Sequence, residues 1–142
     1  MSLEKFLSLV ADPGGIILCY TKDNMQVGEK ANPNRAEHFT SAAALEARAM
    51  ELTLLGCDLY FTPSRFDTRT RNKKAAKGAS AVWVDVDVRD DKGFDTHDAA
   101  LAGIAEFTRL ASLPMPTLVS TGGGYHCYWV CYTQLKPAEW EI

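Results

Sequence analysis

Residues 81–88 (AVWVDVDV) constrain the fold more than any other part of the chain. The segment is rich in β-branched residues and alternates strictly, so it predicts a β-strand. Side chains on a strand point alternately to its two faces, which places the four valines on one face and both Asp85 and Asp87 on the other. The valine face is expected to pack against a helix.

Further helices and strands are predicted on both sides of this strand. Periodicity and capping residues predict three helices, over residues 3–10, 40–55 and 96–110. Apolar, β-prone runs predict four more strands, over residues 16–20, 58–62, 117–120 and 125–132. The last two strands are expected to form a hairpin, and residues 21–39 are expected to be irregular. The pattern predicts an α/β (α+β) fold with a mixed sheet.

From residue 81 onward, the order strand, helix, strand, strand predicts an RRM-like β-α-β-β half, truncated before its last helix and strand. The length of 142 residues favours a single domain, with an N-terminal αβ unit over residues 1–80 and an incomplete RRM-like unit over residues 81–142. Residues 136–142 have the composition of a first helical turn. We therefore expect the natural protein to be longer, with this chain as its amino-terminal part.

Composition excludes several classes of protein. Hydrophobic residues make up 46% and charged residues 23%, which is ordinary for a globular domain and argues against disordered, collagen-like or coiled-coil chains. No apolar run approaches the roughly 18 residues of a membrane helix and no signal-peptide pattern is present, so we expect a cytoplasmic protein without a membrane partner. The four cysteines form no CxxC pair, which predicts reduced thiols.

The charge of −3 is unevenly distributed. Residues 65–77, called here the basic segment, hold six basic side chains and one acid, a net +5, which leaves −8 on the rest of the chain. Such a segment is a candidate phosphate-contacting arm or, equally, a solvated loop without a partner. The candidates for phosphate or nucleic-acid contact are Arg65, Arg71, Lys73 and Lys74.

The carboxylates of Asp85 and Asp87 are candidate metal ligands. Their α-carbons are expected about 6.6 Å apart on one face of a strand, and two such acids repel each other unless cations lie between them. Hard oxygen ligands suit Mg²⁺ or Mn²⁺, and two such metals can clamp a transferring phosphoryl group. The alternative is an exposed edge strand with two acidic outward positions.

Residues 120–124, called here the glycine turn, are Ser120, Thr121, Gly122, Gly123 and Gly124. Residues without Cβ allow backbone N–H groups to approach phosphate oxygens, and His126 could donate a further hydrogen bond. The turn is neither a P-loop nor a GxGxxG motif. The alternative is a plain hairpin turn followed by a half-buried histidine.

The remaining histidines and aromatic side chains have simpler interpretations. His38 and His97 are expected at the surface. Four aromatic residues are expected to pack in the core or on the sheet, with base stacking as the less favoured alternative: Trp83, Tyr128, Trp129 and Trp140.

Together, VWVDVDV and LVSTGGGYHCYWV resemble two motifs of the archaeo-eukaryotic primase superfamily, in particular the primase-polymerases of phages and plasmids. The resemblance covers roughly residues 40–135. It implies that Asp85 and Asp87 bind catalytic Mg²⁺ or Mn²⁺. It also implies that Ser120 or Thr121, with His126, holds the triphosphate of an incoming NTP or dNTP.

The resemblance further implies template-directed nucleotidyl transfer, as in a DNA primase or DNA polymerase, with a DNA template and a fused or associated helicase as partners. The chain departs from the family in two ways. Basic residues that some relatives carry in the second motif are replaced here by Gly122 and Gly123. The acid of the third motif is absent and is expected beyond residue 142, so this chain alone is expected to synthesise weakly or not at all.

Two other functions stay open at this point. A non-catalytic replication initiator module would bind nucleotides or single-stranded DNA through the basic segment, with steep salt dependence. A metal-dependent nuclease would use the same carboxylates for hydrolysis. The glycine turn favours a triphosphate over a phosphodiester and ranks the nuclease last.

Overall fold

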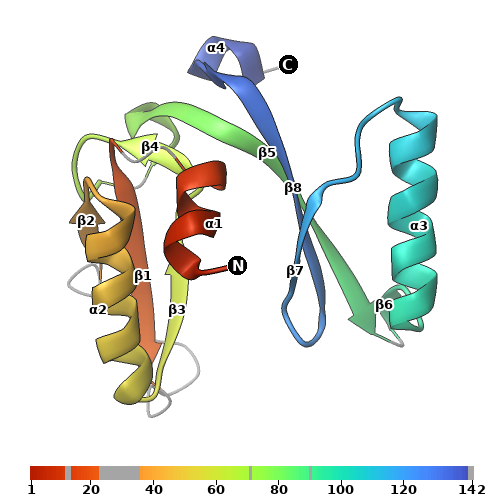
Figure 1. Ribbon diagram of the computed structural model, residues 1–142, viewed down its shortest axis with the longest axis horizontal. Helices are drawn as coiled ribbons and strands as arrows, with labels where there is room; N and C mark the ends of the chain where they lie inside the picture. The colour runs from red at the N-terminus through yellow and green to blue at the C-terminus, as the bar shows by residue number, and fades with distance from the viewer. Residues whose placement is uncertain (12–13, 23–35, 71, 90, 141–142) are drawn as a thin grey trace. The chain divides into compact units, whose positions relative to one another are not determined.

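The computed structural model describes residues 1–11, 14–22, 36–70, 72–89 and 91–140. The fold is α+β, as the sequence predicts. The chain divides into two compact units, one of residues 1–80 with 132–142 and one of residues 81–131, which are described in turn (Figure 1). No helix in the described ranges is long and apolar enough to cross a membrane.

The first unit contains an antiparallel sheet of three strands in the order β2-β1-β3. The strands are β1 (Ile16–Lys22), β2 (Ala36–Phe39) and β3 (Cys57–Phe61). The expectation that residues 21–39 are irregular is wrong for residues 36–39, which form β2. This strand is defined by its pairing with β1 and not by a local sequence pattern. Residues 23–35 lie outside the described ranges.

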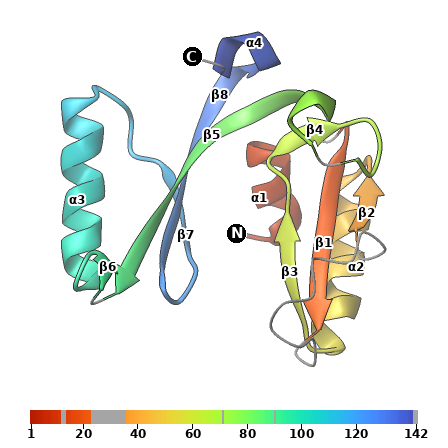
Figure 2. The same cartoon turned by 180° about the vertical axis from the view of Figure 1, so that it is seen from behind.

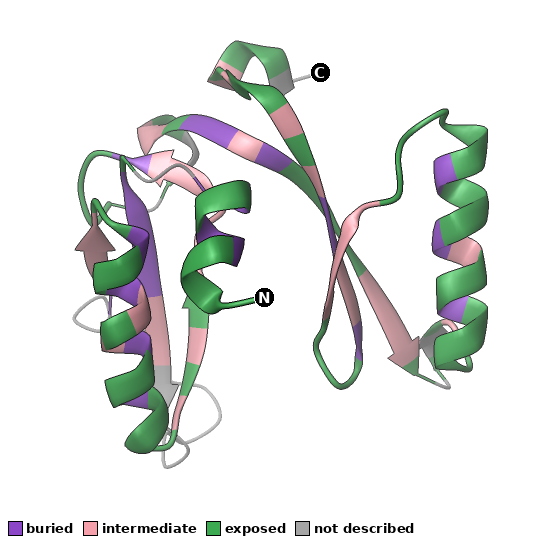
Figure 3. Ribbon diagram, viewed as in Figure 1, coloured by how far each residue is buried: buried purple, intermediate pink, exposed green. Residues whose placement is uncertain are grey.

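Helices α1 (Leu3–Val10) and α2 (Ala42–Leu54) cover one face of this sheet (Figures 1 and 2). Each begins where a serine oxygen accepts a backbone N–H, Ser2 from Lys5 and Ser41 from Ala44, as expected for N-caps. The helices and the sheet each carry buried residues (Figure 3). The core between them is apolar, and its largest fully buried side chains include Leu7, Val10, Ile16, Ile17 and Leu45.

The basic segment is more structured than a solvated loop. Strand β4 (Ser64–Phe66) pairs with the first residues of β5 (Ala76–Arg89), with Ser64 opposite Ala79. A 3-10 turn, η2 (Lys73–Ala75), leads into β5 and is capped by Asn72. The loop interpretation is therefore wrong for both ends of the segment.

The second unit is built on β5, β8 (Gly124–Leu135) and β7 (Thr117–Ser120), which are neighbours in that order. Strands β7 and β8 form the predicted antiparallel hairpin, and the short β6 (Lys92–Gly93) pairs with the end of β5. Helix α3 (His97–Leu110) begins at the N-cap Thr96. The RRM-like comparison stays a prediction. The short α4 (Pro137–Trp140) starts at the predicted proline.

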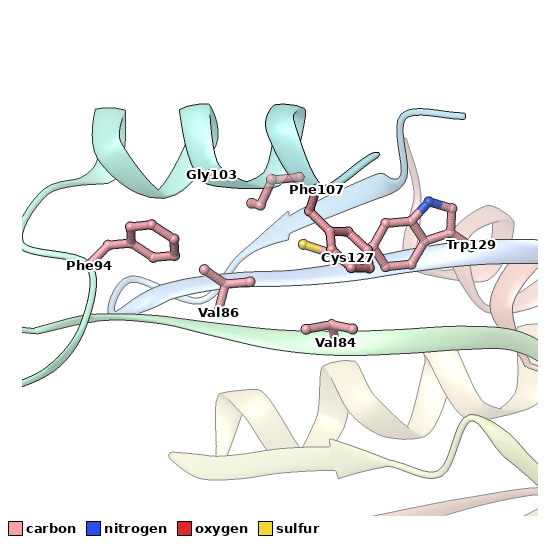
Figure 4. A pocket seen from close by; sticks show the side chains of 8 residues that line it. Val84, Val86, Phe94, Gly103, Phe107, Cys127 and Trp129 are labelled. Atoms are coloured by element: carbon pink, nitrogen blue, oxygen red, sulfur yellow. The ribbon is translucent and has the colours of Figure 1, made fainter. Parts of the chain in front are cut away.

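Helix α3 packs on the valine face of β5, as predicted, but covers it incompletely. An apolar cavity between helix and strands is lined by residues that include Val84, Val86, Ile104 and Cys127 (Figure 4). Val84 remains 43% exposed, so the helix buries the valine face only in part. Three residues of α3 are buried, Ala100, Ile104 and Thr108, so the helix contacts this face through few side chains.

Candidate functional site

His126 and Asp85 lie side by side in the second unit. The imidazole Nε2 of His126 is 3.4 Å from Oδ1 of Asp85, across the neighbouring strands β8 and β5. Val84, Val86 and Cys127 point into the cavity beneath α3, so strand alternation places Asp85 and His126 on the opposite face. This contact brings together two residues that the sequence predicts on separate strands.

Asp87 follows Asp85 on the same face of β5. Its side chain is 30% exposed, against 63% for that of Asp85, and its Oδ2 is 3.5 Å from Nη2 of Arg89. The backbone of Asp87 is held by the residue that follows β6, because the carbonyl oxygen of Asp87 accepts the N–H of Phe94 at 3.0 Å. Asp85 is therefore the more accessible of the two carboxylates.

The glycine turn is held directly against the backbone of β5. The N–H of Val88 donates to the carbonyl oxygen of Gly123 at 2.8 Å. Gly124 has φ +152°, and a Cβ there would lie 2.0 Å from the carbonyl oxygen of Val86. Gly122 has φ +85°, whereas Gly123 has open space around it. Backbone geometry thus explains why positions 122 and 124 are glycine, and no ligand is needed for that explanation.

Residues 120–123 are exposed at the end of the β7–β8 hairpin. The hydroxyl groups of Ser120 and Thr121 and the surface of Gly123 are therefore accessible to a ligand. The N–H of Thr121 donates to the carbonyl oxygen of Gly124 at 3.1 Å, so that amide is used within the turn.

Tyr128 is a neighbour of the site that the sequence assigned to packing alone. Its hydroxyl lies 3.5 Å from Nδ1 of His126, the side of the ring away from Asp85, and its side chain is 4% exposed. Burial, and then the charge of Asp85, raise the pKa of the Tyr128 phenol. The spacing of residues 126 and 128 was the signal in the sequence that could have predicted this contact. Residues two positions apart on a strand share a face.

The basic residues predicted to contact phosphate belong to the first unit. Arg65 lies on β4 with Nη2 3.5 Å from Oδ1 of Asp67, and Lys73 and Lys74 are in η2. Arg71 lies outside the described residues. Their contact with a phosphate stays a prediction.

The other aromatic residues divide into packed and exposed side chains. The indole of Trp129 donates to the carbonyl oxygen of Pro114 at 2.8 Å and packs edge-to-face on Phe107. Trp83 is 45% exposed on the face of Asp85, so it is not a core residue. The side chain of Trp140 lies outside the described part of the chain.

The two remaining histidines differ from each other. Nε2 of His38 is 2.6 Å from the carbonyl oxygen of Phe66 in a half-buried position, so the surface prediction is wrong there. His97 is exposed, as predicted, with Nδ1 3.2 Å from the hydroxyl of Tyr125.

The side chains of this site could hold a divalent cation only together with ligands from another molecule. Within the ranges that the structure describes, no group of three His, Cys, Asp or Glu side chains could hold a metal by itself. Magnesium, however, is commonly bound by one or two carboxylates together with substrate phosphates. Asp85 and Asp87 therefore suit a cation that arrives with a phosphate ligand, and do not form an all-protein cage.

Comparison with known proteins identifies the fold. No family model matches the chain, and no curated protein matches it. Among solved structures, the AEP domain of the primase-polymerase (PrimPol) of cyanophage S-2L matches with a TM-score of 0.62 and 17% sequence identity. The match covers 95% of this chain and 63% of that one, so this chain spans less than two thirds of its neighbour.

The chain therefore has the fold of a primase-polymerase AEP domain. The resemblance to archaeo-eukaryotic primases, inferred from two short motifs, is confirmed at the level of the fold.

Proposed function

We propose that this chain is part of the catalytic core of a DNA primase-polymerase, which joins nucleotides from NTP or dNTP on a DNA template. Its two units, assigned from the sequence as residues 1–80 and 81–142, would form one catalytic domain. The observation that carries the proposal is the 3.4 Å contact between His126 and Asp85, within a chain that has an AEP fold.

The proposed roles follow from accessibility and chemistry. Asp85 and Asp87 would hold Mg²⁺ or Mn²⁺, which when bound neutralises phosphate charge and activates the attacking oxygen. His126, from Nε2, would donate a hydrogen bond to a phosphate oxygen of the nucleotide. The exposed hydroxyls of Ser120 and Thr121 and the glycine turn would complete the triphosphate site.

Two further parts of the proposal concern residues away from this cluster. Arg65, Arg71, Lys73 and Lys74 would contact phosphates of nucleotide or template through charge. The acid of the family's third motif is absent from this sequence, and a helicase partner stays a prediction from the family resemblance.

The proposal is tested with the natural full-length protein in a primer-extension assay containing Mg²⁺ or Mn²⁺. Asp85→Asn keeps the size of the side chain and removes its charge, so synthesis should fall by about 100-fold or more. Asp58→Asn is the matched control, because Asp58 is also an exposed aspartate on a strand. Equal synthesis by Asp85→Asn and wild type would exclude the assignment. The 142-residue chain, assayed in parallel, should extend primers weakly or not at all.

The second candidate is a non-catalytic module that binds single-stranded DNA. The exposed Trp83 favours it, because bases stack on aromatic side chains. The +5 basic segment favours it separately, because basic side chains contact the phosphate backbone. Such a module would bind DNA equally well after Asp87→Asn and would show no primer extension. Degradation of the primer in place of extension would favour the metal-dependent nuclease, the other function that the sequence leaves open.

A further inference from the structure

The apolar cavity beneath α3 lies on the face of β5 opposite to Asp85 (Figure 4). Its volume is about 170 Å³. An engineered protein cavity of about 150 Å³, lined by Leu, Ile and Phe side chains, stays free of water and binds benzene or xenon. The cavity beneath α3 is therefore large enough to hold a molecule with a single six-membered ring.

The side chains that line the cavity have almost no free hydrogen-bonding groups. Trp129 donates its indole N–H to the carbonyl oxygen of Pro114 at 2.8 Å, so this group is already used. Cys127 is fully buried, and its thiol is only a weak donor. A buried water needs several polar partners, and the described lining side chains do not supply them. The lining therefore favours an uncharged, apolar occupant.

Aromatic rings lie at both ends of the cavity, with Phe94 at one end and Phe107 and Trp129 at the other (Figure 4). Phe107 and Trp129 pack edge-to-face, with ring centroids 5.8 Å apart. Glycine at position 103 of α3 admits the ring of Phe94, because a Cβ there would clash with it. Aromatic rings attract a further ring edge-on or offset, and the sulfur of Cys127 can contact a ring favourably. The cavity therefore suits an aromatic occupant.

The cavity has a buried floor and an accessible rim. Cys127 and Ile104 are 0% and 4% exposed, whereas Val84 and Phe107 are 43% and 50% exposed. A small molecule can therefore enter without unfolding α3. It would also cover apolar surface that water now contacts, which is the main source of favourable free energy for an apolar ligand.

We propose that the cavity beneath α3 is a binding site for a small, uncharged aromatic molecule with a single ring. The ligand would contact β5 through Val84 and Val86, and α3 through Ile104. The inference goes beyond the proposed function and does not rest on it. The two valines face the cavity, whereas the carboxylates of the candidate metal site lie on the other face of the strand.

Toluene is the probe, and methyl ¹H–¹³C NMR spectra of the chain locate it. The methyl resonances of Val84, Val86 and Ile104 should shift progressively and saturate as toluene is added. Those of Ile17 and Leu45, in the core of the first unit, should not move. Unchanged resonances of the three cavity residues up to the solubility limit of toluene would overturn the proposal.

Benzoate tests the chemical class of the ligand, because it has the same ring with a negative charge. It should bind about tenfold more weakly than toluene or worse, since burying a charge without a partner is costly. Equal binding of benzoate and toluene would overturn the assignment to an uncharged ligand.

Two phenylalanine variants test the position of the ligand. Val84→Phe adds a ring at the cavity wall and should lower the affinity for toluene about tenfold or more, because ring and ligand compete for one volume. Val82→Phe is the matched control. Val82 is on the same face of β5 and is 48% exposed, but it does not line the cavity. This control should bind toluene as wild type does. Equal affinity of the two variants would overturn the proposal.

An aromatic side chain of a partner protein is the alternative occupant, and N-acetylphenylalanine amide tests it. This compound has the ring of toluene together with peptide groups, which need hydrogen-bond partners. It should bind more weakly than toluene, because the described lining side chains offer its peptide groups no strong partner. Tighter binding than toluene would identify a peptide side chain as the occupant and would overturn the assignment to a small molecule.

Discussion

The imidazole of His126 lies 3.4 Å from the carboxylate of Asp85, although the two residues are far apart in the sequence. The contact depends on β5 and β8 being neighbours in the sheet, with the glycine turn held against β5 by the bond from Val88 to Gly123. The site is therefore a product of strand pairing, and changes to the turn should affect it.

Gly124→Ala should destabilise the fold, by about 2–4 kcal/mol, because a Cβ would meet the carbonyl oxygen of Val86 at 2.0 Å. Gly123→Ala, with open space around it, should change the free energy of unfolding by less than about 0.5 kcal/mol. Urea denaturation of both variants measures the difference. Equal destabilisation by the two alanines would contradict the geometry of the turn.

The same pair of glycines tests the proposed nucleotide site. Because Gly123→Ala should leave the fold intact, weaker binding of a Mg²⁺-nucleotide by this variant would report contact between ligand and turn. Isothermal titration calorimetry makes the measurement. Wild-type affinity in Gly123→Ala would argue against a ligand at this position.

Stability should fall at alkaline pH through Cys127. Burial, and then the charge of Asp85, raise the pKa of this thiol, so the folded state keeps the proton to a higher pH than the unfolded state does. The unfolded chain therefore loses its proton first, and the free energy of unfolding decreases as pH rises above the ordinary thiol range. Denaturation curves measured across that range should show the decrease.

Cysteine variants identify the source of this pH dependence. Cys127→Ala should reduce the slope of stability against pH, whereas Cys131→Ala on the same strand should not. The comparison uses slopes, because loss of the fully buried Cys127 also changes packing. Identical slopes in wild type and Cys127→Ala would contradict the prediction.

Thr96→Ala should destabilise the protein by about 1 kcal/mol through loss of the α3 N-cap. The side-chain oxygen of Thr96 accepts the N–H of Ala99 at 3.1 Å, and alanine leaves that donor without its acceptor. Thr133→Ala, an exposed threonine on β8, is the control. Thermal denaturation should separate the two variants by several degrees.

A nucleoside triphosphate should raise the melting temperature in the presence of Mg²⁺ and much less after EDTA is added. Ligand that binds only the folded state stabilises it, and the carboxylates present suit a cation that arrives with phosphates. Asp85→Asn should abolish the shift, and Asp58→Asn should retain it. A shift of equal size with EDTA would contradict a metal-dependent site.

Local features of the molecule could be predicted from the sequence. The strict alternation of residues 81–88 fixed the strand and put Asp85 and Asp87 on one face, because side-chain direction on a strand depends only on position. The helix starts could also be predicted, from serine and threonine N-caps. The hydrogen bond of an N-cap forms within the first turn of its own helix and so depends only on local sequence.

Only the tertiary structure decided which strands are neighbours in the sheet. That order in turn decided which side chains meet in the candidate site. Strand β2 exists because β1 pairs with it, and Gly124 is needed because the turn approaches the backbone at Val86. The contacts of His126 with Asp85 and Tyr128 likewise depend on distances that no local pattern encodes. Periodicity reports which way a side chain points, whereas long-range packing determines what it meets there.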